Sequence, residues 1–128
     1  MLEKLTSKEY LKAWKTKNKD HYRQYQRDYY KNHPEKHKRR HLKREYNLSI
    51  EEFNKLLIIQ SNVCAICQQP ETHKEYHSGK IKSLAVDHNH ETGKIRGLLC
   101  SNCNVAVGLL KDSTLHAQAL VDYLKKFE

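Results

Sequence analysis

Two pairs of cysteines constrain this chain more than any other feature of its sequence. All four cysteines lie in two Cys-x-x-Cys motifs, Cys64 to Cys67 and Cys100 to Cys103, with 32 residues between the motifs. Each motif places two thiolates on one tight turn, and two such pairs complete a tetrahedral metal site. Soft thiolates favour Zn²⁺ over Mg²⁺ or Ca²⁺, although the ligands alone leave an iron site open.

A four-cysteine zinc site is expected to hold the fold together, because its coordination sphere is closed to reactants. Disulfides are the alternative use of these thiols. No window reaches the length of about 18 apolar residues that a membrane span needs, and Lys4, Lys8 and Lys12 interrupt any run typical of a signal peptide. We therefore expect an intracellular protein with no membrane partner, in which thiols stay reduced and bind metal.

The net charge of +9 is confined to the N-terminal third of the chain. Residues 1–46 carry 15 Lys and Arg against 6 Asp and Glu, whereas residues 47–128 carry 9 of each kind. This asymmetry predicts a basic DNA-binding arm, residues 1–46, followed by a second domain, residues 47–128. A solvated charged helix is the alternative. The phosphate contacts of the arm are assigned to Arg23, Arg27, Lys36, Lys38, Arg39, Arg40, Lys43 and Arg44.

The arm is predicted to be mainly helical. Thr6 and Glu9 form a capping-box pattern, and no Gly or Pro interrupts the chain from there to about Lys31. Pro34 is well placed to begin a second helix, in which Leu42 is the only aliphatic residue, so little packing on a core is expected. Six of the eight tyrosines lie in the arm. They are suited to stack on bases or to bind phosphate, and packing within the protein is equally open.

The second domain is predicted to be small and α+β. Ser49 and Glu52 form another capping box, which begins an apolar helix. Residues 81–86 and 94–99 have the pattern of two strands, and Thr92-Gly93 gives the turn between them. A helical run follows from Asn104. A last helix, capped by Ser113, has an apolar face made of Leu115, Leu120, Tyr123, Leu124 and Phe127.

The run Asp87-His88-Asn89-His90 stands at the end of the first predicted strand, facing the helix that carries Asn104. Carboxylate and amide oxygens are hard ligands suited to Mg²⁺. An imidazole can take a proton from water near neutral pH. Asp87, His88 and Asn104 would thus supply a metal ligand, a base and a second ligand. By itself, an Asp-His pair is more often a turn or a satisfied polar contact.

Together these motifs resemble the phage recombination endonuclease VII family, one of the His-Me finger (ββα-metal, HNH-like) nucleases. The resemblance covers about residues 47–111. Besides the two cysteine pairs, it rests on Leu84-Ala-Val-Asp-His-Asn-His90, on Gly93-Lys-Ile-Arg-Gly-Leu-Leu-Cys100 and on Cys103-Asn104. The basic, tyrosine-rich arm also resembles N-terminal extensions of small phage and bacterial members.

The resemblance implies a zinc-stapled His-Me finger core with a nuclease site in it. Asp87 and Asn104 would hold one catalytic Mg²⁺ or Mn²⁺ beside the scissile phosphate, and His88 would be the general base. His90 would contact phosphate or steady the site, and Arg96 joins the DNA-binding residues. The cation would stabilise the leaving 3′ oxygen, so that products carry 5′-phosphate and 3′-hydroxyl ends.

The sequence therefore predicts a metal-dependent endonuclease that nicks or cuts duplex DNA with low sequence preference. The alternatives are a resolvase for Holliday junctions or other branched DNA, and a zinc-stapled DNA-binding protein without catalysis. The family's junction-resolving member has an acidic residue shortly after the Asn, where this chain has Ala106 and Val107. It also has long dimer-forming helices and a further C-terminal domain, whereas one terminal helix is expected here. A monomer and a homodimer both fit the sequence. We expect a protein of phage or bacterial origin that acts in the cytoplasm of a bacterial host.

Overall fold

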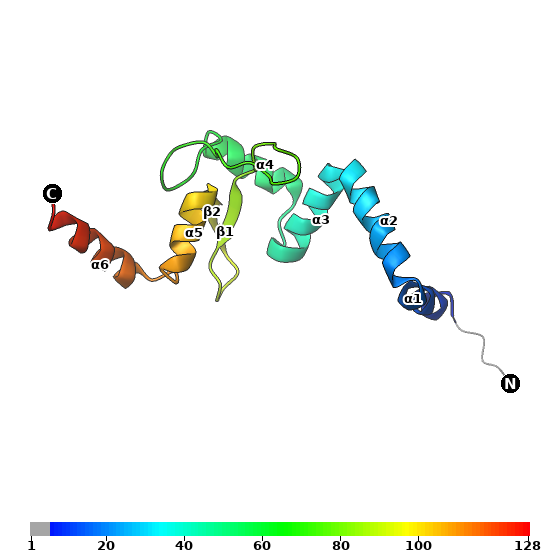
Figure 1. The fold of residues 1–128 in the computed structure, drawn as a ribbon. Coiled ribbons are helices and arrows are strands. Elements are labelled where there is room, and N and C mark those ends of the chain that lie inside the picture. Colours follow the sequence, from blue (N-terminus) through cyan, green and yellow to red (C-terminus); the bar gives the residue numbers. More distant parts are fainter. Residues whose placement is uncertain (1–5) are drawn as a thin grey trace. The chain divides into compact units, whose positions relative to one another are not determined.

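The computed structural model describes residues 6–128, which form a small α+β structure (Figure 1). The chain divides into two compact units, Met1–His41 and Leu42–Glu128. Over the described residues the order of elements is α1 (Ser7–Lys17), α2 (Lys19–Asn32), α3 (Pro34–Tyr46), α4 (Ile50–Ile59), β1 (Ala85–His88), β2 (Ile95–Leu99), α5 (Ser101–Leu109) and α6 (Thr114–Lys125).

The described part of the first unit begins with the predicted capping box but does not form the single long helix that was expected. Thr6 N–H donates to the Glu9 carboxylate at 2.8 Å, and Glu9 N–H donates to the Thr6 hydroxyl. The helix then ends at Asn18, whose backbone N–H and side-chain Nδ2 both donate to the Trp14 carbonyl, at 2.8 and 2.9 Å. An asparagine side chain that bonds to the nearby backbone competes with helix continuation, which explains the break between α1 and α2.

The second unit is organised around a hairpin of β1 and β2. The strands are antiparallel, with Val86 opposite Leu98 and Asp87 opposite Gly97. β1 begins at Ala85, later than predicted, while Ile81 forms only an isolated bridge with Lys74. The predicted turn is confirmed: residues 89–94 reverse the chain, with Gly93 at φ 70°, a backbone conformation that glycine adopts without strain.

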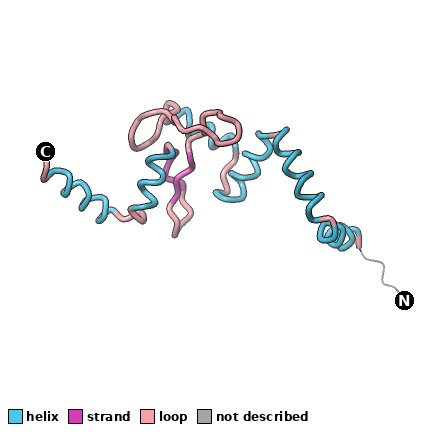
Figure 2. The backbone as a smooth tube through the Cα atoms, in the orientation of Figure 1, coloured by secondary structure: helices cyan, strands magenta, loops and turns pink. Residues whose placement is uncertain are grey.

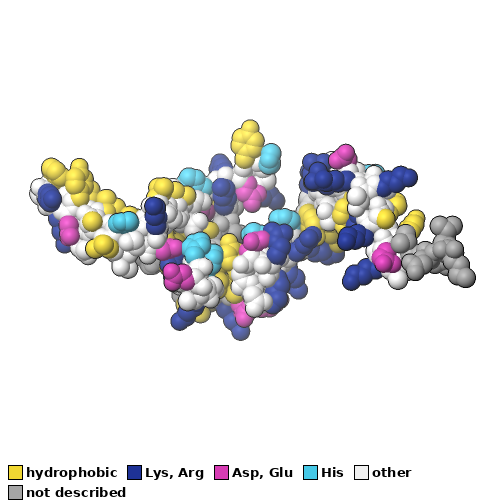
Figure 3. Space-filling view, turned by 90° about the horizontal axis from the view of Figure 1, so that it is seen from below, with side chains coloured by type: hydrophobic (Ala, Val, Ile, Leu, Met, Phe, Trp, Pro, Cys, Tyr) yellow, Lys and Arg dark blue, Asp and Glu magenta, His cyan; other side chains and the backbone are white. Residues whose placement is uncertain are grey.

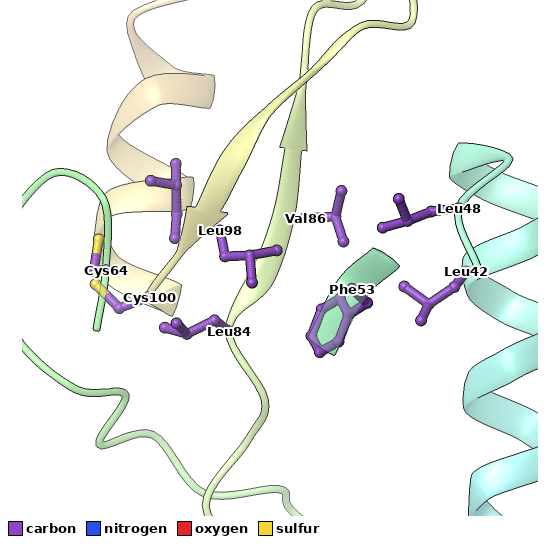
Figure 4. Packing of buried hydrophobic residues seen from close by; sticks show 9 residues of the cluster. Leu42, Leu48, Phe53, Cys64, Leu84, Val86, Leu98 and Cys100 are labelled. Atoms are coloured by element: carbon purple, nitrogen blue, oxygen red, sulfur yellow. The ribbon is translucent and has the colours of Figure 1, made fainter. Parts of the chain in front are cut away.

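The core of this unit lies between the hairpin and helices α3, α4 and α5 (Figure 4). Phe53 and Leu98 are 1% and 0% exposed at its centre. Leu42 is 3% exposed, so the C-terminal end of α3 packs on the core although it offers a single aliphatic side chain. Leu48 is buried beside it, at the start of the segment that leads into the α4 capping box. The remaining members are Cys64, Leu84, Val86, Leu99 and Cys100.

A long connection, seen as loop in Figure 2, joins α4 to β1. Gln60, at the end of α4, fastens the start of this connection to the sheet. Its Nε2 donates to the Leu98 carbonyl at 2.9 Å, and its Oε1 accepts from Leu98 N–H at 2.8 Å. The amide thus pairs with β2 as a neighbouring strand would. A Cβ at Gly97 would lie 3.2 Å from Gln60 Oε1, so this close approach favours glycine.

Helix α6 keeps its apolar side chains on the surface, some of which are seen in Figure 3. Leu115 and Phe127, which the sequence placed on its apolar face, are each 76% exposed. The helix begins where predicted, because the Ser113 hydroxyl accepts from His116 N–H at 3.2 Å. Among residues 6–128, no helix combines the length and the apolar character needed to cross a membrane.

Candidate metal centre and active site

The four cysteine sulfurs converge, as their spacing predicts. The Sγ atoms of Cys64, Cys67, Cys100 and Cys103 all lie within 4.8 Å of one another. The Sγ atoms of Cys67 and Cys100 lie 3.8 Å apart. A tetrahedral ion with Zn–S bonds of about 2.3 Å places its sulfur ligands about 3.8 Å apart. The donor set and this spacing therefore fit a structural zinc ion.

Backbone N–H groups point at two sulfur atoms of this cluster. Ile66 N–H points to Cys64 Sγ at 3.4 Å, and Cys103 N–H points to Cys100 Sγ at 3.5 Å. Burial opposes ionisation of Cys64, but hydrogen bonds from the N–H groups of Cys100, Cys67 and Ile66 outweigh it and lower the pKa of this thiol to about 6. Burial beside the other sulfurs raises the pKa of Cys103 to about 12. A bound cation would stabilise all four thiolates together.

Glu71 ties the segment after the first cysteine pair to helix α5. One carboxylate oxygen accepts from the N–H groups of Thr72 and His73 at 2.9 and 2.8 Å. The other accepts from both N–H and hydroxyl of Ser101, each at 2.7 Å. Burial would raise the pKa of Glu71, but these hydrogen bonds lower it to about 2.

Replacing Glu71 by glutamine is expected to destabilise the second unit by about 2 kcal/mol at pH 7, because a buried carboxylate bonded to four donors loses its charge. The pKa of about 2 in the folded protein lies below the ordinary 4.5. The stabilisation is therefore complete above pH 4.5 and is lost as the pH falls toward 2. Urea unfolding of the zinc-loaded wild type and E71Q at pH 7 measures the difference.

The matched control for this prediction is E75Q. Glu75 lies in the same segment, but it is exposed and accepts a side-chain hydrogen bond only from Ser78 among the described residues. We expect E75Q to unfold like the wild type at both pH 7 and pH 5. Equal stability of E71Q and E75Q at pH 7 would show that the Glu71 bonds contribute nothing to folding.

A β-bulge shapes the site on the hairpin. Asp87 pairs with Gly97 and His88 pairs with Ile95, so Arg96 is the extra residue on β2. Bulges re-aim the side chains near them, and here the Arg96 guanidinium meets the Asp87 carboxylate. Its Nε donates to Asp87 Oδ2 at 2.7 Å and its Nη2 donates to Asp87 Oδ1 at 2.8 Å. Arg96, assigned to DNA contact from the sequence, thus forms a bidentate pair with Asp87.

Asp112 completes this charged cluster and was not identified from the sequence. Its Oδ1 accepts from Arg96 Nη2 at 2.6 Å, and its Oδ2 lies 3.6 Å from His90 Nε2. The Arg96 guanidinium lowers the pKa of Asp112, and the hydrogen bonds to Asp87 and Asp112 raise the pKa of Arg96. Asp87, Arg96 and Asp112 line a hollow of about 270 Å³ with residues of α5 and α6. The structure therefore gathers two carboxylates in one cavity.

His88 contacts other rings rather than the carboxylates. Its imidazole centroid lies 4.6 Å from that of His90 and 5.3 Å from the Tyr46 ring, which meets it edge to face. His88 is half-buried. Tyr46 and His90 thus limit the positions that the His88 ring can take.

Asn104 lies on α5, which packs against both strands of the hairpin. The helix begins at Ser101, earlier than predicted, because Cys100 caps it. Asn104 is exposed, and Val107, three residues on, lines the hollow that contains Asp87. Asn104 itself is not among the residues that line this hollow, so its placement beside Asp87 stays a prediction. Asn89, by contrast, is used locally: its Oδ1 caps the turn through the N–H groups of Glu91 and Thr92.

Basic residues alternate with tyrosines along the sequence of the first unit, and Figure 3 shows Lys and Arg side chains interspersed with hydrophobic ones there. Lys36 donates to the Tyr29 hydroxyl at 2.9 Å, and Arg40 donates to the Tyr30 hydroxyl at 2.6 Å. Tyr29 also stacks on His33, with centroids 4.4 Å apart. These tyrosines thus hold cations at the surface between α2 and α3. The candidate phosphate-binding residues Arg23, Arg27, Lys36, Arg39, Arg40, Lys43 and Arg44 are exposed, and Lys38 is half-buried.

Comparison with known proteins connects these features to one family. A family model described as recombination endonuclease VII matches residues 39–126. The Gene 59 protein of Mycobacterium phage D29 is 39% identical over 82 residues, which cover 63% of this chain and 46% of that protein. The Gene 59 protein of Mycobacterium phage L5 is 35% identical over 80 residues, which cover 62% and 44%. The matched region thus spans less than half of these relatives. No solved structure matches the chain.

Proposed function

Because the family match covers more than half of its length, the chain belongs to the recombination endonuclease VII family, as its motifs predict, and from this premise we propose that it is a metal-dependent DNA endonuclease. The proposed core is a His-Me finger made of β1, β2 and α5, with a structural zinc ion on the four cysteines. The consecutive order of these elements and their mutual packing support this assignment.

The observation that carries the proposal is the placement of Asp87 and His88 at the end of β1, beside a helix that bears Asn104. In the proposed reaction His88 takes a proton from water as the water attacks phosphorus. The bond from phosphorus to the 3′ oxygen breaks, this oxygen takes a proton from solvent, and the products carry 5′-phosphate and 3′-hydroxyl ends. His90 and Arg96 are placed to contact the phosphate or to steady the site.

The proposed catalytic cation would be held by Asp87 and Asn104. Oxygen donors of this kind suit Mg²⁺ or Mn²⁺. In addition, Asp87 already attracts a positive charge, the Arg96 guanidinium, to both carboxylate oxygens. When bound, the cation would supply charge stabilisation for the phosphate and the leaving oxygen.

The proposal is tested with zinc-loaded protein and end-labelled DNA. We expect cleavage of linear duplex in Mg²⁺ or Mn²⁺, binding with little cleavage in Ca²⁺, and products that DNA ligase can rejoin. Rejoining should not require prior removal of 3′-phosphates, since the 3′ ends should already be hydroxyls. Binding without cleavage in any of these cations would leave a zinc-stapled DNA-binding protein, the non-catalytic alternative.

Resolution of branched DNA is the second candidate, favoured by the recombination named in the family description. The same assay distinguishes it when a four-way junction and a duplex of equal length compete in one reaction. Preferential cleavage of the junction by a large factor would assign a resolvase. Comparable rates would assign a duplex endonuclease of low preference, which is the activity we propose.

We further propose that the basic arm binds the DNA backbone. Removing two exposed charges on α2 with R23Q/R27Q is expected to lower the slope of log binding constant against log salt concentration by about 2, because each phosphate contact releases about one counterion. Binding is measured on duplex DNA in Ca²⁺. K125Q/K126Q, an equal change of charge at the end of α6, should leave the slope unchanged; equal slopes for both variants would contradict the assignment.

A further inference from the structure

Arg96 is shared between two carboxylates, one of which is the proposed ligand of the catalytic cation. Its Nη2 donates to Asp87 at 2.8 Å and to Asp112 at 2.6 Å, while its Nε donates to Asp87 alone at 2.7 Å. One nitrogen thus serves two acceptors. A small movement of the guanidinium would break the bonds to Asp87 while the bond to Asp112 persists.

The guanidinium and a cation compete for the same atoms. Both oxygens of Asp87 are hydrogen-bonded to Arg96. A divalent cation on this carboxylate would lie a few ångströms from a fixed positive charge, and in a partly buried site the repulsion between them is large. Binding of a cation to Asp87 would therefore favour movement of Arg96 to another acceptor.

Asp112 is placed to be that acceptor. It follows α5 in a turn in which Lys111 and Asp112 both have φ near 54°, and its N–H donates to the Val107 carbonyl at 3.2 Å. The turn holds the carboxylate against Arg96, and the second oxygen faces His90 at 3.6 Å. The three residues after Asn104 include no acidic side chain. Besides Asp87, Asp112 is the residue that brings a negative charge to the lining of the hollow.

We propose that Asp112 is a positioning residue that takes Arg96 over from Asp87 as the catalytic cation binds, so that guanidinium and cation exchange places on one carboxylate. The inference rests on the proposed function. Once released from Asp87, the Nε–H and the Nη2–H that now bond to this carboxylate are free for other acceptors. The exchange would therefore present these donors to the DNA phosphate only when the cation is in place.

The test measures Mn²⁺ binding by calorimetry, without DNA, to zinc-loaded wild type, D112N, R96Q and the double variant. Asparagine is chosen because it tolerates a positive φ. D112N is expected to bind Mn²⁺ about tenfold more weakly, since Arg96 loses a charged acceptor and stays on Asp87. R96Q should bind more tightly than wild type. In the R96Q background, D112N should have little effect on Mn²⁺ affinity.

The double variant separates exchange from a simple effect of charge. If Asp112 only adds negative potential, D112N weakens Mn²⁺ binding equally with and without Arg96, and this additivity would overturn the exchange. If neither wild type nor R96Q binds Mn²⁺, the cation site of the proposed function fails, and the exchange fails with it. If the wild type binds Mn²⁺ but the effects of D112N and R96Q are additive, the exchange is overturned while the cation site of the proposed function stands.

Discussion

Replacement of Cys67 by serine is expected to unfold the second unit. Cys67 is exposed, so the substitution removes almost no buried surface, but it removes one of four ligands. In zinc-finger peptides, binding of a structural zinc ion contributes roughly 10 to 16 kcal/mol at neutral pH. Whole domains are stable by only about 5 to 15 kcal/mol. Zinc content, far-ultraviolet circular dichroism and dispersion of amide resonances report the loss.

The control for C67S is C67H at the same exposed position. Histidine is also a zinc ligand, so C67H is expected to keep one zinc ion and a folded second unit. Comparing the two variants separates ligand loss from the change of side chain. A folded C67S protein that retains wild-type stability without zinc would contradict the assignment of the cysteines as the structural centre.

Replacement of His88 by alanine is expected to reduce single-turnover cleavage by about 10² to 10⁴, the range contributed by a positioned general base. His88 is half-buried and contacts rings of Tyr46 and His90, so some loss of packing accompanies the change. Thermal unfolding therefore needs to be measured alongside the rate. Free imidazole should restore part of the activity of H88A, because it replaces the missing base and not the packing.

H116A is the matched control for His88. His116 is exposed on α6, and its backbone N–H, not its ring, makes the hydrogen bond to Ser113. We expect H116A to cleave at the wild-type rate. A similar loss of activity in both variants, or no rescue of H88A by imidazole, would argue against His88 as the base.

The parts of the fold that could be predicted are those encoded by neighbouring residues. The capping boxes at Thr6 and Ser49 need only residues three apart, and the structure confirms both. The cysteine pairs were predictable because a metal site demands that they meet. The break at Asn18 was missed because asparagine is tolerated inside helices as well as at their ends. Leu42 was missed because one buried side chain leaves no periodic pattern.

The residues of the site were likewise predictable only where the sequence carries a local signal. Asp87 and His88 form a recognisable pair in the sequence, and the structure places them at the end of β1 as predicted. Glu71 and Asp112 had no local signal. Glu71 reaches Ser101 across 30 residues, and Asp112 reaches Arg96 across 16. The bulge that turns Arg96 toward Asp87 follows from the register of the hairpin, which no single residue specifies.

The most direct test of the central claim is magnesium-dependent nicking of a supercoiled plasmid by zinc-loaded protein. Magnesium is omitted rather than chelated in the control, because a chelator would also strip the zinc centre. We predict conversion to open-circular or linear DNA by the wild type in Mg²⁺, none without it, and almost none by H88A of equal zinc content. No magnesium-dependent conversion, or equal conversion by wild type and H88A, would contradict a nuclease site at Asp87 and His88.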